Sequence, residues 1–255
     1  MNSFIPWVGG KKLLRKEIVK RFPEKMDRYI EVFGGAAWVL FYKPQYAKEE
    51  IYHDINSELV NLFRYIKYHC GAVSEELNYI LNARETFLYF RENKQLQFMT
   101  ELQRAVRFYY LIRTSYGAKM TSYGGNYRNV SILKDIEAIQ QRLYKVVIDN
   151  KNFVDIFKQY DKEGALFYCD PPYYKTEKMY DTGEFVFDQQ QHILLRDMLA
   201  NIKGKFVLSY HDDMFIRQLY RDFKIEEIQR SNNLGITLGR VLKLPTCVQS
   251  ANLVN

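Results

Sequence analysis

The sequence predicts an α/β protein, in which short apolar strands alternate with amphipathic helices. Two observations support this class. The segments expected as strands are short apolar runs that end at turns or polar residues, and apolar side chains recur at helical spacing between them. The chain has 255 residues, of which 47% are hydrophobic and 26% charged, and this composition excludes a disordered or collagen-like protein. Its length fits one large domain or a domain with an insert.

The expected elements divide into two groups along the chain. Those before residue 70 are a helix over 12–22, a strand over 29–33, a helix that follows the Gly34–Gly35 turn and ends near Pro44, a strand over 50–54 and a helix over 56–69. Those after residue 142 are strands over 145–148, 165–169 and 206–209, separated by helices of roughly 10 to 14 residues.

The segment between these groups has helical patterns but no convincing strand, so we expect residues 1–70 and 143–255 to form the sheet domain and 71–142 an insert. Within it, residues 102–134 contain six Lys or Arg and no Asp or Glu, together with five tyrosines and three glycines. Basic side chains hold phosphates and glycines let the backbone approach a groove, which favours a nucleic-acid surface. An ordinary solvated face is the alternative.

Composition agrees with such a partner without proving it. The net charge is +7 and the pI about 9.1, which suits a polyanion. Aromatic residues make up 16% of the chain, with 21 tyrosines that offer both a stacking face and a polar tip. Many basic, tyrosine-rich proteins bind no DNA, however, so the charge alone decides nothing.

Several other classes are disfavoured by the sequence. The longest apolar run, residues 36–42, is far shorter than the ~20 residues that span a bilayer, and no secretory signal is visible. The three cysteines, Cys70, Cys169 and Cys247, are widely spaced and lack nearby histidine pairs, so neither a disulfide scaffold nor a metal site is expected. A reducing compartment fits this pattern.

The sharpest local feature is the turn Asp170-Pro171-Pro172-Tyr173, directly after the expected strand over 165–169. Ligands of open α/β sheets bind beyond the carboxyl ends of the strands. Two prolines remove two backbone donors, so the turn offers mainly hydrogen-bond acceptors and an aromatic face. Such a set suits the exocyclic amino group of a base, and the Asp170 carboxylate would stabilise positive charge that develops on nitrogen during methylation. A plain strand-ending turn is the alternative.

Weaker motifs lie at the ends of other expected strands. Glu31-Val32-Phe33-Gly34-Gly35 links a strand to a helix, as a loop for a nucleoside cofactor would. Asp54 ends the next strand, where an acid can accept both ribose hydroxyls, although Asp54 or Asn56 could equally cap a helix. Near the N-terminus, Trp7 and Lys11 flank a Gly-Gly turn, where their side chains can contact a ligand. A turn of this kind before a helix more often has only a structural role.

Together these motifs resemble the Dam-type (D12 class) DNA adenine-N6 methyltransferases, in the family's order and over nearly the whole chain. The matching segments are Pro6-Trp7-Val8-Gly9-Gly10-Lys11, Glu31-Val32-Phe33-Gly34-Gly35-Ala36-Ala37, Asp54-Ile55-Asn56, Asp170-Pro171-Pro172-Tyr173 and Leu208-Ser209-Tyr210-His211-Asp212. Three positions depart from the pattern: Ala37 replaces a glycine, Asn152 an acid and Tyr210 an asparagine. The Ala37 departure puts the local path of the backbone in doubt.

The resemblance implies a class I methyltransferase fold: a doubly wound, seven-stranded mixed sheet with a mainly helical target-recognition insert. It implies S-adenosyl-L-methionine as cofactor and S-adenosyl-L-homocysteine as product. The implied cofactor-binding residues are Trp7, Lys11, Glu31, Phe33, Gly35, Asp54, Phe153 and Asp170. The implied catalytic residues, which would hold the flipped base, are Asp170, Pro171, Pro172 and Tyr173. No metal is expected.

The expected macromolecular partner is double-stranded DNA, with base and phosphate contacts at Arg113, Tyr116, Lys119, Tyr123, Asn126 and Arg128. The resemblance also implies a monomer in the cytoplasm of a bacterial or phage-infected cell, with room for a cognate restriction endonuclease that makes no direct contact. Methylation of cytosine N4 is the alternative reaction, because that base also presents an amino group. A non-catalytic DNA-binding protein with a nucleotide-binding fold is the alternative from another class.

Overall fold

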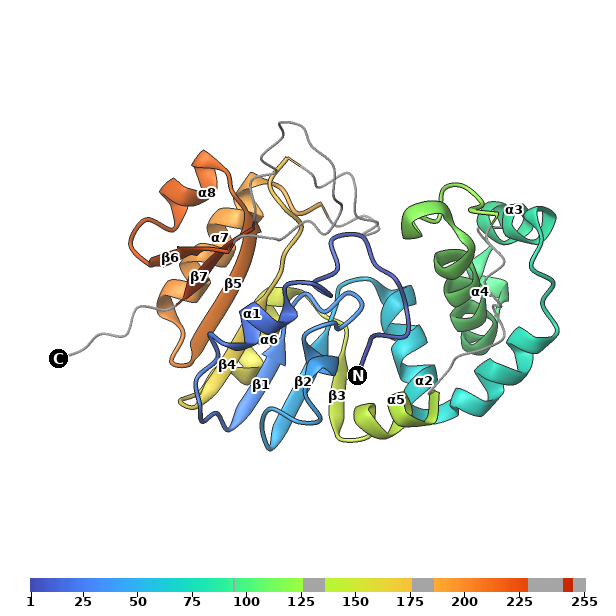
Figure 1. Cartoon of the computed structure of the whole chain (residues 1–255), viewed down its shortest axis with the longest axis horizontal. Coiled ribbons are helices and arrows are strands. Elements are labelled where there is room, and N and C mark those ends of the chain that lie inside the picture. The colour runs from blue at the N-terminus through green and yellow to red at the C-terminus, as the bar shows by residue number, and fades with distance from the viewer. Residues whose placement is uncertain (94, 126–135, 176–185, 229–244, 250–255) are drawn as a thin grey trace, which may run out of the picture.

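The computed structural model describes residues 1–93, 95–125, 136–175, 186–228 and 245–249. It has a mixed α/β architecture, as the sequence predicts, with a central sheet and a group of helices beyond one of its edges (Figure 1). Among the described residues, none of the helices combines the length and the apolar character needed to cross a lipid bilayer.

Five parallel strands form the centre of the sheet, in the order β3-β2-β1-β4-β5. Beyond β5 the order continues to β7 and then β6, and β7 runs antiparallel to both neighbours. The strands are β1 (Arg28–Glu31), β2 (Glu49–His53), β3 (Val146–Asp149), β4 (Ala165–Cys169), β5 (Lys205–His211), β6 (Lys224–Glu227) and β7 (Pro245–Gln249). All five expected strands are therefore present, and each of their ends lies within two residues of the expected position.

Of two helices expected near the N-terminus, one is shorter than predicted and the other is replaced by turns and a 3₁₀ helix. Helix α1 covers only Arg15–Val19, and Leu13, within the expected range of the helix, is 63% exposed. No α-helix follows the Gly34–Gly35 turn; the chain instead passes through turns into the 3₁₀ helix η1 (Leu40–Tyr42). Positive φ angles at Gly35 and Ala37 interrupt the helical path there, and the N–H of Leu40 donates to Glu31 instead of to a preceding turn.

Helix α2 (Ser57–Asn78) begins where predicted but continues past residue 70, with non-helical backbone angles at His69. The expected insert contains α3 (Arg84–Glu92), η2 (Leu96–Phe98), α4 (Glu101–Thr114), η3 (Tyr116–Ala118) and α5 (Ile136–Leu143). Helix α2 packs against α4 and α5, so it joins the sheet to the outlying helices (Figure 1).

The remaining helices flank the sheet: α6 (Phe153–Tyr160), α7 (Gln189–Asn201) and α8 (Met214–Leu219). Buried apolar residues form one core that includes the α2 and α4 helices and a second core beneath α6 and α7. Strands β2, β1 and β4 are neighbours and parallel, so the loops that follow them meet at one edge of the sheet. Those loops carry Asp54, Glu31 and Asp170.

Candidate active site at the carboxyl ends of the strands

A cavity opens at the carboxyl ends of β1, β2 and β4. It encloses about 720 Å³, part of it open to solvent. Its lining comes from the N-terminal segment, from Glu31 and Tyr168 at the ends of β1 and β4, and from the loops after the three strands. The residues that the sequence predicted for it and that do line it are Trp7, Lys11, Glu31, Phe33, Gly35, Asp54, Asp170 and Pro172.

Asp170, the first residue after β4, has its carboxylate held in place by three side chains. Oδ1 accepts hydrogen bonds from the Ser209 hydroxyl at 2.8 Å and from the Tyr173 hydroxyl at 3.3 Å. Oδ2 lies 2.5 Å from the Lys11 ammonium. The side chain keeps 17% of its surface exposed, so the carboxylate faces the cavity and not the core. Pro171 is buried beneath it, while Pro172 lines the cavity.

Lys11 is a buried cation at the same point. A turn in which Gly10 N–H donates to the Trp7 carbonyl brings the N-terminal segment over the sheet. The Lys11 ammonium then donates to the Gly9 carbonyl at 2.8 Å and lies 4.9 Å from the centre of the Tyr173 ring. Lys11, which the sequence predicts as a cofactor-binding residue, forms an ion pair with Asp170 in this structure.

Glu31 ends β1 and is buried. Its Oε2 accepts from the Tyr29 hydroxyl at 2.9 Å and from the Leu40 N–H at 2.8 Å. Burial raises the pKa of this carboxyl to about 8, although both hydrogen bonds act in the opposite direction. Because Glu31 also lines the cavity, a cationic group placed there would favour the ionised carboxylate.

The glycine loop after β1 is tied directly to β2. Gly35 N–H donates to Asp54 Oδ2 at 2.8 Å, and the Tyr52 hydroxyl donates to the Gly35 carbonyl at 2.7 Å. A Cβ on Gly35 would come within 2.8 Å of the indole nitrogen of Trp7, so only glycine fits beneath that ring. Ala37, where the family pattern has glycine, takes a left-handed φ of 54°, so the loop keeps a glycine-like path.

Asp54 serves the local backbone as well as the cavity. Its two oxygens accept from the N–H groups of Gly35 and Asn56, and burial raises its pKa. Asn56 caps α2, because its side chain accepts from Leu59 N–H at 3.0 Å. The helix-cap alternative is therefore confirmed for Asn56, while Asp54 lies in the cavity wall.

Aromatic side chains extend the wall beyond Asp54. The ring of Phe33 packs against Phe153 and Phe187, with ring centres 5.8 and 5.4 Å away. Phe153, predicted as a cofactor contact, is buried behind Phe33 at the start of α6 and does not line the cavity. It supports the wall from the core side.

Two neighbours of Asp170 were not predicted as site residues. Ser209 on β5 donates to Asp170, and the Tyr168 hydroxyl lies 3.2 Å from the Ser209 hydroxyl and also lines the cavity. The Ser209 motif was visible in the sequence, but its contact with residue 170 depends on the pairing of β4 with β5. Among the described residues there is no cluster of three side chains suited to hold a metal ion.

Three of the residues predicted to contact DNA, Tyr116, Lys119 and Tyr123, lie on a turn after α4. Backbone hydrogen bonds from Tyr116 N–H to the Ser122 carbonyl and from Gly124 N–H to the Thr114 carbonyl close this hairpin, residues 114–124. Tyr116 is 72% exposed and Lys119 is exposed. Tyr123 anchors the hairpin, because its hydroxyl donates to Asn82 and its ring packs against Phe87.

Other basic residues of the insert have different positions. Arg113 lies in the last turn of α4, with its guanidinium 6.0 Å from the centre of the Tyr109 ring. Arg104 forms an ion pair with Glu58 of α2, and Arg107 is buried with a hydrogen bond to the Phe90 carbonyl. Of the six basic residues within 102–134, Arg104 and Arg107 therefore make contacts inside the protein. Asn126 and Arg128 lie outside the described residues.

The parallel sheet and the acidic, glycine-containing loops at its edge define an α/β protein whose ligand site lies at the carboxyl ends of the strands. Comparison with known proteins makes the class specific. Residues 7–234 match the family described as "D12 class N6 adenine-specific DNA methyltransferase", and the chain belongs to this family.

Relatives with assigned names agree. The chain is 29% identical to a type II methyltransferase, M1.LlaDCHI, of Lactococcus lactis, over 92% of this chain and 90% of the relative. It is 27% identical to the retron Ec67 DNA adenine methylase of Escherichia coli, over 94% and 87% of the two chains. It is 29% identical to the DNA adenine methylase of Haemophilus influenzae, over 90% and 87%.

Proposed function

We propose that this protein transfers a methyl group from S-adenosyl-L-methionine to N6 of adenine in double-stranded DNA. The observation that carries the proposal is the position of Asp170. Its carboxylate lies in one cavity with Glu31, Asp54 and the glycine loop. Acceptors for an amino group and a cradle for a nucleoside cofactor are thereby combined, in a chain of the adenine-specific family.

The cavity residues fit the cofactor chemically. Glu31 would hold the cationic amine, Lys11 the carboxylate and Asp54 the ribose hydroxyls. Trp7 lies over Gly35 with no room for a side chain between them, and Phe33, backed by Phe153, would pack on the apolar parts of the ligand. When bound, the cofactor supplies a methyl group on a positively charged sulfur and leaves as S-adenosyl-L-homocysteine.

Asp170 would bind the target amine. Its carboxylate accepts N–H hydrogen bonds, with Ser209 and Tyr173 fixing its orientation, and Pro172 removes a competing backbone donor from the wall. Accepting these bonds would leave the nitrogen lone pair free for the methyl group that the cofactor supplies. Asp170 then stabilises the positive charge on nitrogen until a proton is lost to solvent.

A base inside a duplex cannot reach this cavity, so the adenine must flip out, at a cost of a few kcal/mol. Stacking on Tyr173 would recover roughly 1–3 kcal/mol. The hairpin after α4 would contact the DNA through Tyr116 and Lys119, with Arg113 and Tyr123 supporting it. Asn126 and Arg128 remain predicted contacts of the same segment.

We propose that the sheet is the seven-stranded sheet of a class I methyltransferase, formed by residues 1–70 and 143–255, and that 71–142 is a target-recognition insert. The non-helical backbone angles at His69 within α2, next to residue 70, support this boundary. We still predict that the protein is monomeric and cytoplasmic and that it has a cognate restriction endonuclease.

The two alternatives are not favoured. Cytosine N4 methylation would use similar pocket chemistry, but the family match and the named relatives are adenine-specific. A non-catalytic DNA-binding protein would have no need for an acidic residue that three side chains orient within a cavity.

Methylation of a random-sequence DNA library tests the function. Mass spectrometry of the nucleosides should show N6-methyladenine, and reading the modified positions gives the target site. Asp170→Ala should lower the transfer rate by about 10³-fold while the Kd for S-adenosyl-L-homocysteine changes by only a few fold. N4-methylcytosine, or an Asp170→Ala variant with full activity, would refute the proposal.

A further inference from the structure

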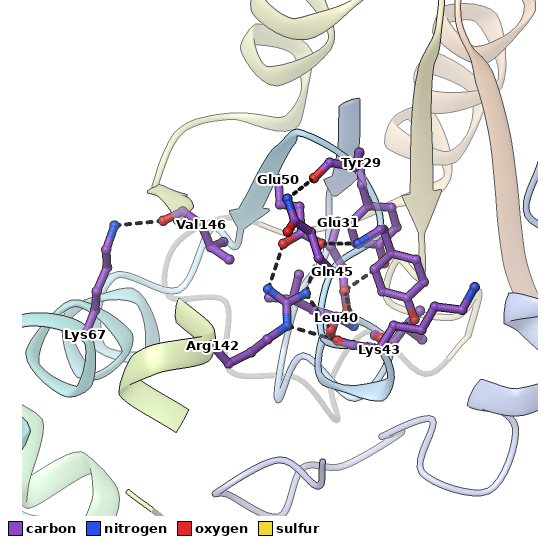
Figure 2. A network of polar contacts seen from close by, with 12 residues as sticks. Tyr29, Glu31, Leu40, Lys43, Gln45, Glu50, Lys67, Arg142 and Val146 are labelled. Atoms are coloured by element: carbon purple, nitrogen blue, oxygen red, sulfur yellow. Dashed lines mark hydrogen bonds and ion pairs between the residues drawn. The ribbon is translucent and has the colours of Figure 1, made fainter. Parts of the chain in front are cut away.

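A buried network links α5 to the acid at the base of the cavity (Figure 2). Arg142 lies near the end of α5, and its guanidinium binds both carboxylate oxygens of Glu50 on β2, at 2.7 and 2.9 Å. It also donates to the carbonyls of Lys43 and Leu40, at 3.0 and 2.9 Å. Four hydrogen bonds from one side chain therefore hold the η1 segment against β2.

The peptide groups of Leu40 carry this network to the cavity. The Leu40 carbonyl accepts from Arg142, while the Leu40 N–H donates to Oε2 of Glu31 at 2.8 Å. Tyr29 donates to the same oxygen. Among the described residues, both hydrogen bonds to the Glu31 carboxylate therefore fall on Oε2, and Glu31 lines the cavity wall.

We propose that Arg142 is a positioning residue for cofactor binding: by holding η1, it aligns Leu40 N–H so that the Glu31 carboxylate is oriented toward the cationic amine of the cofactor. The inference rests on the proposed function, because it assumes that this ligand enters the cavity. Arg142 itself does not line the cavity, so its effect on the cofactor passes through Leu40 and Glu31.

The charge of Arg142 acts in the same direction as its geometry. Burial and the negative charge of Asp170 raise the pKa of Glu31, whereas Arg142 lowers it, which favours the ionised form that a cationic ligand needs. Four buried or partly buried tyrosines also interact with Glu31, namely Tyr29, Tyr46, Tyr52 and Tyr168, and Asp54 lines the same cavity. Lys11 also lines the cavity.

Only arginine suits this position. Its planar guanidinium can bind a carboxylate through two parallel hydrogen bonds and still reach two carbonyls, whereas a lysine ammonium is a compact charge with three donors. Arg142→Lys therefore keeps the charge but not the full set of contacts. Arg142→Met removes both.

The test measures the Kd for S-adenosyl-L-methionine by calorimetry between pH 6 and 9, on the full chain. The cofactor amine titrates in this range as well, so each profile is compared with that of Glu31→Gln, which has no carboxylate to ionise. We expect Arg142→Met to weaken binding at least tenfold at pH 7.5 and to move the rise in affinity to higher pH. Arg142→Lys should weaken binding less and keep the pH midpoint closer to that of the wild type.

The matched control is Arg104→Met. Arg104 also joins the insert to α2 through an Arg–Glu ion pair, but its partner, Glu58, has no hydrogen bond to the η1 segment. This variant should retain the wild-type Kd and pH profile. The amide signal of Leu40 in ¹⁵N NMR provides a second measurement, because it should follow the ionisation of Glu31 and change in Arg142→Lys.

The results separate the two proposals. If the wild type fails to bind S-adenosyl-L-methionine, the proposed function fails. If the wild type binds it and folded Arg142→Met has an unchanged Kd and pH midpoint, or Arg104→Met loses as much, the role of Arg142 is refuted and the function stands. Should Arg142→Met fail to fold, Arg142→Lys decides: an unchanged Kd and an unchanged Leu40 signal would refute the role.

Discussion

The Lys11 ammonium contacts the Asp170 carboxylate at 2.5 Å, across 159 positions of the chain. Lys11 is buried, and it lies above the Tyr173 ring as well. A cation therefore occupies the place beside Asp170 and Tyr173 where, in the proposed reaction, the target amine would bind. The same lysine is the proposed partner of the cofactor carboxylate, so Lys11 would contact both the cofactor site and the site of the target base.

Lys11→Met should raise the KM for S-adenosyl-L-methionine at least tenfold, because a charge-assisted hydrogen bond is worth about 1.5–3 kcal/mol. Steady-state kinetics at saturating DNA measures this. The matched control is Lys12→Met, at an exposed neighbour whose ammonium lies over Trp38. Equal KM values for the two variants would argue against a cofactor contact at Lys11.

The pH dependence of stability should carry a contribution from Glu31. Its pKa is about 8 in the folded protein against an ordinary value of 4.5, so the folded state retains a proton that the unfolded state loses. The stability from this group is complete below pH 4.5 and is lost as the pH rises through 8. Glu31→Gln mimics the protonated side chain, so its Tm should fall less than that of the wild type between pH 5 and 8.5 in scanning calorimetry. If the Tm of the wild type and that of Glu31→Gln changed equally with pH, the raised pKa of Glu31 would be contradicted.

Substitution by alanine should have opposite effects on stability at Gly35, in the loop after β1, and at Gly71, in α2. At Gly35, with φ at 48°, a Cβ would lie 2.8 Å from the Trp7 indole, so Gly35→Ala should destabilise the protein by about 1–2 kcal/mol and weaken cofactor binding. Gly71 in α2 has no atom within 4 Å of its added Cβ, so Gly71→Ala should stabilise by about 0.5–1 kcal/mol. Urea unfolding measures both, and a neutral Gly35→Ala would show that the Trp7 ring moves freely.

The hairpin after α4 should contribute to DNA binding without affecting the cofactor. Lys119→Ala should lower the slope of log K against log salt by about 0.9, the value for one phosphate contact. Tyr116→Ala should weaken DNA binding roughly 5- to 100-fold if the ring stacks on a base. Fluorescence anisotropy at several salt concentrations measures both. The control is Tyr144→Ala, at a similarly exposed tyrosine just after α5; an equal loss there would locate the binding surface elsewhere.

The sequence predicted the five parallel strands because each is a short apolar run that ends at a polar residue or a turn, whereas β6 and β7 were not predicted. Glu31, Asp54 and Asp170 follow or end such runs, and parallel strands bring their ends together. The helices were predicted less accurately than these strands. The expected helix after Gly34–Gly35 has the apolar composition of one, but positive φ angles and the Leu40–Glu31 hydrogen bond turn it into a short 3₁₀ segment.

The sequence by itself determined which chemical groups the site contains and at which strand ends they lie, because local patterning sets strands and turns. Only the tertiary structure decided which groups meet: Lys11 with Asp170, Ser209 with the same carboxylate, and Arg142 with Glu50 and Leu40. These contacts join segments 39 to 159 residues apart. They depend on strand order and on the packing of α5. A buried charge needs a partner close in space, and the fold can supply that partner from a distant part of the chain.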